Sequence, residues 1–308
     1  MNYLKPYTVT SAMLSSTTVA EPASGEVAWV SGAAYTAGDE VIRTTTHRRY
    51  IASQTHTGRT TAPELDAPYW NDVGPTKRWA PFDQYTSTAA TDVTSISYVL
   101  APGYFNALAL YGLTGADLHI VLKDAPGGAV LYEHEGPLTE DPAGWYEYLF
   151  VAPKVLTQFN VSGLPIRPTA ELTVTVTAAT GQPVGIGMLV LGDLVSLVGD
   201  LADFGGTEYG ATAEPVSYSY IKTDDFGETT IVRRSAATSM TAKIVLPAKN
   251  ADDALRLIQD VLDVPVAWIA LPGNPKYKGL NVFGLGSARV AYENYSIARI
   301  DLTVKGMI

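Results

Sequence analysis

One seven-residue run of this chain alternates without a break between polar and apolar side chains. It reads Glu-Leu-Thr-Val-Thr-Val-Thr over residues 171–177. Successive side chains of a β-strand point to opposite faces of its sheet. The run therefore predicts a strand that has one face in a core and the other in water.

Short runs of strand-forming residues recur throughout residues 77–200, and turn-forming pairs such as Pro102-Gly103 and Ser162-Gly163 separate them. Turns at intervals of roughly 8–14 residues are typical of antiparallel sandwiches. We therefore expect residues 77–200 to form an antiparallel β-sandwich of the jelly-roll or galectin-like kind. The expected strands are Val93–Leu100, Ala107–Leu113, Leu118–Leu122, Ala129–Tyr132, Trp145–Phe150, Gln158–Val161, Ala170–Thr177 and Ile186–Leu191.

The composition limits the classes of protein to consider. A length of 308 residues suggests two or three domains, and a hydrophobic content of 46% is enough to build a core. The chain has no cysteine, which excludes disulfides, cysteine zinc sites and a cysteine nucleophile. A formal net charge of −10 disfavours a nucleic-acid or anionic-membrane partner, because binding to phosphates depends on Lys and Arg.

The two ends of the chain differ in character. Residues 1–24 have spaced apolar side chains among Ser and Thr, and we expect an extended arm that docks on another domain or subunit rather than a free tail. The first twenty residues do not resemble a signal peptide, and no apolar run approaches the roughly 18 residues that cross a bilayer. Residues 201–308 predict a small α+β domain.

That C-terminal domain contains the one main helix that the sequence predicts. Asn250 is the expected N-cap, and Pro265 ends the helical region. Two strands, Tyr218–Lys222 and Thr229–Arg233, flank a hairpin turn. The apolar face of the helix is expected to contain Ala254, Leu255, Ile258, Val261 and Leu262. The further strands expected in this domain are Thr238–Leu246, Val266–Leu271, Leu280–Phe283, Ser287–Tyr292 and Ser296–Val304.

Residues 25–76 predict a third, very small unit. Gly38-Asp39 marks a turn between short strand-forming runs, and Pro63 breaks the chain again. So short a segment buries little surface, so its core must come from a few large aromatic side chains. The aromatic residues available are Trp29, Tyr35, Tyr50, Tyr69 and Trp70.

The framework of this unit resembles the chitin-binding type modules of carbohydrate-binding families 5 and 12. The matching residues are Trp29, Tyr35, Gly38, Asp39, Val41, Tyr50, Ala52, Thr57, Pro63, Trp70 and Gly74. The resemblance implies a small β module and makes Trp29, Tyr35, Tyr50, Tyr69 and Trp70 candidate carbohydrate-binding residues. In sugar-binding members an exposed aromatic pair follows the Tyr-x-Ala step, where this chain has Ser53-Gln54-Thr55. The alternative is that the five aromatics form only a mini-core.

Catalytic and metal-binding patterns are weak. The triplet Glu133-His134-Glu135 is interpreted as the solvated edge of a strand, because alternation separates the histidine from both glutamates. The acidic turn at residues 224–228 is too short for an EF-hand loop and is explained by turn chemistry. No nucleophile elbow, phosphate loop or dinucleotide fingerprint occurs in a fitting context. We expect no enzyme activity, no metal and no cofactor.

Over its length the chain resembles a class of bacteriophage tail and baseplate proteins. The matching segments are Lys5–Leu14, Asp72–Ala80, Glu208–Gly210, Tyr218–Thr230 with Arg233, and Ile300–Gly306. The resemblance implies a virion protein of the phage tail, made in the bacterial cytoplasm, with a C-terminal part like ring-forming, tail-tube-related domains. The implied partners are other tail proteins and further copies of the chain, with a host cell-surface glycan as a weaker contact.

Two other functions stay open at this point. The first is a host-receptor, or adsorption, protein that binds carbohydrate through the small module. The second is a glycan-active enzyme with an accessory module, although no acidic pair lies in a recognisable setting.

Overall fold

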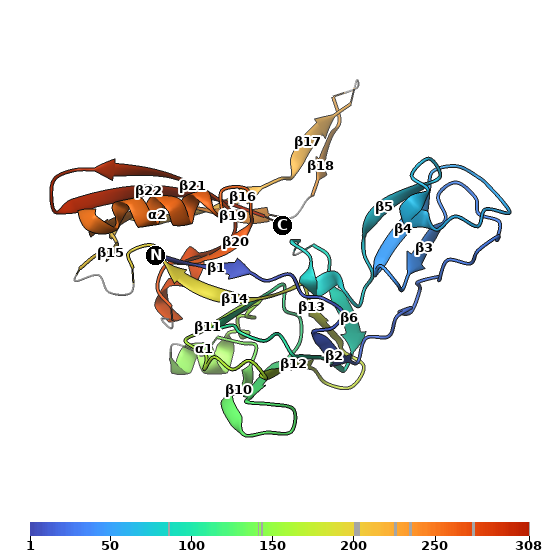
Figure 1. Ribbon diagram of the computed structural model, residues 1–308, viewed down its shortest axis with the longest axis horizontal. Helices are drawn as coiled ribbons and strands as arrows, with labels where there is room; N and C mark the ends of the chain where they lie inside the picture. Colours follow the sequence, from blue (N-terminus) through green and yellow to red (C-terminus); the bar gives the residue numbers. More distant parts are fainter. Residues whose placement is uncertain are drawn as a thin grey trace.

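The computed structural model describes residues 1–85, 87–140, 142, 144–199, 204–224, 227–233, 236–272 and 275–307. The predicted mainly-β fold is confirmed: the named strands of the described residues form five antiparallel sheets. A large sheet and a smaller one make the body, and a small sheet stands apart at one side (Figure 1).

The largest sheet joins the N-terminal arm, the sandwich and the C-terminal part of the chain. It has ten strands, and both β15 and β16 pair with its strand β19. In spatial order the strands are β11 (Gln158–Ser162), β8 (Ala107–Tyr111), β14 (Met188–Ser196), β1 (Asn2–Pro6), β20 (Val266–Ile269), β21 (Asn281–Tyr292), β22 (Ile297–Gly306) and β19 (Ala236–Pro247). The last position is shared by β15 (Gly206–Thr207) and β16 (Thr212–Ser217), which pair with different parts of β19.

A five-stranded sheet packs against one end of the ten-stranded sheet. Its order is β10 (Val130–Pro137), β9 (Asp117–Lys123), β12 (Glu171–Thr177), β7 (Ser95–Leu100) and β2 (Leu14–Thr17). The alternating run forms β12, and its Leu172, Val174 and Val176 are fully buried. They share one core with Leu108 and Leu110 of β8, so the two sheets form the predicted sandwich.

The ten-stranded sheet is strongly curled. Every residue of β8 is buried, and Tyr111 of this strand lies on the face turned away from the sandwich core. Its ring contacts that of Phe283, at 5.9 Å between centroids. Three strands separate β8 from β21 in the sheet, so this contact requires the sheet to bend around its own second face.

The N-terminal arm is docked into this sheet. Its strand β1 lies between β14 and β20, with Tyr3 opposite Val195 on one side and Trp268 on the other. The hydroxyl of Tyr7 donates a hydrogen bond to Asp193 of β14. Burial, followed by this bond and the Asp193 charge, raises the pKa of Tyr7 to about 12. Residues 2–6 are therefore a structural link between the sandwich and the C-terminal strands.

Helix α2 (Ala251–Gln259) covers the C-terminal part of the ten-stranded sheet (Figure 1). Ala254, Ile258 and Val261 are buried there as predicted, but Leu255 is 36% and Leu262 is 50% exposed. The predicted face was too broad, because the short side chains of Ala251 and Ala254 bring the helix close to the strands and leave Leu255 at its margin. Leu262 follows the end of the helix.

Asn250 occupies the predicted N-cap position of α2, but its side chain does not cap the helix. A turn of 3-10 helix, η3 (Ala248–Asn250), already precedes α2, and the Asn250 side chain makes no capping bond. Its amide instead donates a hydrogen bond of 2.8 Å to the carbonyl of Val198. The side chain thus ties the helix to the end of β14 rather than capping it.

The expected strand Trp145–Phe150 is a short helix, α1. Its backbone bonds run from Tyr148 N to Gly144 O and from Val151 N to Glu147 O. None of its six residues is buried. Aromatic residues favour strands only where a pleated surface packs against them, and here no neighbouring strand meets the segment.

Three smaller sheets complete the fold. A three-stranded sheet comprises β3 (Glu40–Arg43), β4 (Arg48–Ala52) and β5 (Trp70–Pro75). The pairs are β6 (Ala90–Val93) with β13 (Pro183–Ile186), and β17 (Tyr220–Thr223) with β18 (Thr229–Val232). The turn predicted between β17 and β18 includes residues 225–226, which lie outside the described part. The fold also contains three further short 3-10 helices among the described residues, η1 (Pro63–Leu65), η2 (Ala80–Phe82) and η4 (Pro275–Leu280).

Candidate functional site

The five candidate aromatics of the small module meet in one cluster. Val41, Tyr50, Ala52 and Trp70 form its buried centre, and Trp29, Tyr35 and Tyr69 pack partly buried around it. The side chains come from β3, β4, β5, the segment before β3 and the loop between β4 and β5. The module therefore builds its core from these rings, and they are structural whether or not any of them also binds a ligand.

Trp70 is the central ring of this cluster. It is 3% exposed, and Tyr35 meets it edge to face at 5.0 Å between centroids. His56 meets it in the same way from another side, at 5.1 Å. Such edge-to-face contacts are favourable, and together they enclose the indole.

The two rings at the rim are covered by arginines. The guanidinium of Arg43 lies 4.9 Å from the centre of the Trp29 ring, and that of Arg59 lies 3.6 Å from the centre of the Tyr69 ring. Arg59 donates two hydrogen bonds, of 2.7 and 2.9 Å, to the buried Asp66. This pairing raises the pKa of Arg59. A fixed cation thus occupies one face of each ring, where a sugar would otherwise stack.

The tripeptide that replaces the usual exposed aromatic pair holds loops together. Ser53 Oγ and Gln54 Nε2 donate hydrogen bonds of 3.0 and 3.1 Å to the carbonyl of Pro68. Thr55 Oγ1 accepts one of 3.1 Å from the amide of Ala37. All three residues are exposed. They offer polar groups to solvent but no flat apolar surface.

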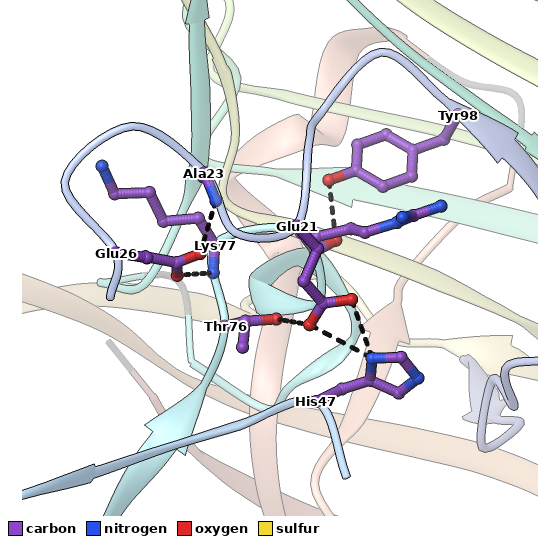
Figure 2. A network of polar contacts seen from close by, with 8 residues as sticks. Glu21, Ala23, Glu26, His47, Thr76, Lys77 and Tyr98 are labelled. Carbon is purple, nitrogen blue, oxygen red and sulfur yellow. Dashed lines mark hydrogen bonds and ion pairs between the residues drawn. The ribbon is translucent and has the colours of Figure 1, made fainter. Parts of the chain in front are cut away.

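A polar network that no sequence pattern predicts joins the small module to the body (Figure 2). The Glu21 carboxylate, whose side chain is only 4% exposed, lies 2.9 Å from Nδ1 of His47 in the β3–β4 turn. Thr76 Oγ1 donates a 2.7 Å hydrogen bond to the same carboxylate. The His47 ring stacks on Trp79 at 4.5 Å. The arm, the module and the following segment therefore converge on one buried carboxylate.

A second carboxylate strengthens the same junction. Glu26 accepts hydrogen bonds of 2.8 Å from the amides of Ala23 and Lys77, one through each oxygen (Figure 2). No spacing in the sequence reveals either network, because Glu21 lies 26 residues from His47 and 55 from Thr76. Together they fix how the module emerges from the body.

The two histidines at the edge of the sandwich, His119 and His134, both contact neighbouring side chains. Glu133 of β10 pairs with His119 of β9 at 3.0 Å, and both side chains are exposed. The neighbouring His134 lies against Phe159 at 4.4 Å between ring centres, where burial and then the nearby His119 lower its pKa. Within the described residues, no three His, Asp or Glu side chains gather closely enough to hold a metal ion.

Among the described residues outside the small module, two elements each expose several apolar side chains. One is the hairpin β17–β18, in which Ile221 and Ile231 are 66% and 62% exposed. The other is α1, whose Trp145 is 81% exposed. The sequence pattern predicts the hairpin but not its exposure, and it predicts a sandwich strand where α1 lies. Large exposed apolar groups of this kind mark interaction surfaces.

Comparison with known proteins gives no indication of the family or function of this chain. No protein-family model, no curated protein and no solved structure matches this chain. In the described part of the chain, no helix combines the length and apolarity needed to cross a bilayer.

Proposed function

We propose that this chain is a structural protein of a bacteriophage tail tip or baseplate that assembles through protein–protein contacts. The observation that carries the proposal is the hairpin β17–β18, which extends away from the body (Figure 1). The side chains of these projecting strands are almost all exposed, and contact with another protein in an assembly would bury them.

The hairpin has apolar side chains on both faces. Ile221 lies opposite Ile231 across the two strands, and the adjacent pair, Tyr220 and Val232, faces the other way. A two-stranded sheet is marginally stable alone in water. A partner that covers both faces would supply the missing apolar contacts, whereas a solvated loop would need polar residues at these positions.

The base of the hairpin is held by the large sheet. β16 pairs with β19 up to Ser217 and Ala236, and β17 and β18 continue outward from this pair. The ten-stranded sheet can therefore position the hairpin on a neighbouring subunit or tail protein. Free strand edges and exposed apolar pairs are what β-sheet addition between subunits uses.

The small module has a secondary place in this proposal. It stands apart from the body (Figure 1), and in a multimer several copies would face outward together. Multivalency would then strengthen even a weak glycan contact. The covered rings of Trp29 and Tyr69 give such a contact little support, so we propose assembly as the main function.

The hairpin can be tested by charging one of its faces. Replacing both isoleucines, Ile221→Lys with Ile231→Lys, should abolish incorporation of the protein into phage particles, because two ammonium groups would have to be desolvated in the contact. Unfolding temperature should change little, since both positions are exposed. The measurement is the amount of protein in purified particles when the variant replaces the native chain.

A matched control uses exposed aliphatic residues on other strands. Val93→Lys with Val130→Lys adds the same charge at positions that are 61% and 51% exposed. This control should still be incorporated. Normal incorporation of the hairpin variant would refute the role proposed for the hairpin.

A further inference from the structure

Helix α1 presents four large apolar residues on one side, here called the aromatic tip: Trp145, Tyr146, Leu149 and Phe150. Their exposed fractions run from 62% to 81%. At 100° per residue they fall on one arc of about 140°. No residue of the helix is buried, so this face is not part of the sandwich core.

On the other side of α1, Tyr148 is 68% exposed and its ring meets that of Trp145 edge to face at 6.2 Å. Glu147, Tyr148 and Val151 line a cavity of about 290 Å³ together with Thr139 and Glu140. The charged residue of the helix is thus turned away from the aromatic tip. The aromatic tip is thus a side of α1 without a charged residue, and it is exposed instead of packing on its own domain.

The aromatic tip is held in a defined shape. Tyr146 and Phe150 pack on each other at 5.4 Å between ring centres. At the base of the loop, Thr139 forms a β-bridge with Val155, and the amide of Glu140 donates a 2.9 Å hydrogen bond to the backbone carbonyl of Lys154. A preformed aromatic surface loses little conformational entropy on binding.

We propose that the aromatic tip is a self-association surface through which two copies of this chain pack about a two-fold axis. Three aromatic residues and a leucine at these exposures offer roughly 500 Å² per copy, or about 1,000 Å² in total. That area reaches the size at which specific interfaces begin. One copy of the tip contacting an ordinary polar surface would bury less apolar area.

The charges around the tip favour a second copy over a lipid surface. Helices that bind membranes combine an apolar face with Lys and Arg. Here the only charged residue of the helix is Glu147, and the residues that line the adjacent cavity include one cation, Lys154, beside Glu140. In a two-fold contact through the tip, each Glu147 points away from the partner, so no like charges meet.

This inference goes beyond the tail function and does not depend on it. The hairpin variant Ile221→Lys with Ile231→Lys isolates the tip, because any assembly through the hairpin is removed. In that background, light scattering over a range of concentrations should show a monomer–dimer equilibrium. Adding Trp145→Ala or Phe150→Ala should raise the dimer dissociation constant at least tenfold, as expected for aromatic anchors at a contact centre.

The control for these substitutions is another exposed aromatic residue. Tyr295 is fully exposed in the turn between β21 and β22, so Tyr295→Ala should leave the dimer dissociation constant unchanged. A protein that stays monomeric at every concentration in the hairpin background would overturn the proposal. So would a dimer that Trp145→Ala and Phe150→Ala leave intact.

The absence of cysteine permits a second, geometric test. Leu149 lies near the middle of the tip, so Leu149→Cys should form a disulfide-linked dimer under mild oxidation, whereas Tyr295→Cys should not. Co-sedimentation with neutral lipid vesicles measures whether the aromatic tip binds a lipid bilayer instead of a second copy of the chain. Vesicle binding that Trp145→Ala removes, without a cysteine-linked dimer, would assign the tip to a bilayer and overturn self-association.

Discussion

Replacing Trp268 by alanine is expected to destabilise the body of the protein by about 3–5 kcal/mol. Trp268 lies at the centre of β20 and is fully buried. Its ring packs against Tyr3 at 5.5 Å, and its indole nitrogen donates a 3.2 Å hydrogen bond to the carbonyl of Gly284. Removing it leaves a large cavity where the arm strand β1 meets the C-terminal strands.

The same ring explains a glycine in the next strand. A Cβ built on Gly286 of β21 would lie 2.1 Å from Cζ2 of Trp268. The cavity left by Trp268→Ala therefore opens against bare backbone, which has no side chain to fill it. This geometry places the expected cost toward the upper part of the range.

Chemical denaturation followed by circular dichroism measures this change. Tyr295→Ala is the control, since it removes a large aromatic side chain from a fully exposed position and should shift the free energy of unfolding by less than about 0.5 kcal/mol. Equal effects of the two substitutions would contradict the role given to Trp268 in joining the arm to the sheet.

Replacing Trp70 by alanine is expected to unfold the small module while the body stays folded. The cluster around Trp70 is the apolar core of residues 25–76, and a unit of this size has little stability to lose. A cost of about 3–5 kcal/mol for a buried tryptophan would exceed it. The body keeps its own cores in the two larger sheets.

Limited proteolysis with mass analysis of the fragments detects this local unfolding. Cleavage within residues 25–76 should become rapid in Trp70→Ala and stay slow in Thr55→Ala, which alters an exposed polar contact of the same module. A Trp70→Ala protein that resists proteolysis but loses retention on chitin would contradict a structural role for this ring. It would instead favour the carbohydrate-binding function.

Alternation and turn spacing were enough to predict most strands and the antiparallel class. The run at residues 171–177 forms β12, with its apolar side in the sandwich core. In β21, by contrast, we expected two strands separated at Gly284 and Gly286, and the structure has one strand of twelve residues. These glycines are needed for close approach, since a Cβ on Gly284 would lie 2.1 Å from the carbonyl of Lys305.

Long-range packing accounts for what the sequence did not reveal. Nothing local indicates that residues 2–6 lie in the middle of a sheet, between strands nearly 190 and 270 residues further along the chain. The segment Trp145–Phe150 has strand-forming residues, but it becomes a helix because it has no strand beside it. In the small module the aromatic cluster was foreseen as a set, whereas Glu21 and His47 meet only through the folded junction.

The most direct test of the proposed function is the location of the protein in phage particles. Immunogold labelling would be applied to particles purified from the phage that encodes the chain, with an antibody raised against the small module. A structural tail protein predicts gold at the distal end of the tail. Abundant protein in the infected-cell lysate, together with unlabelled particles that lack it, would contradict the account.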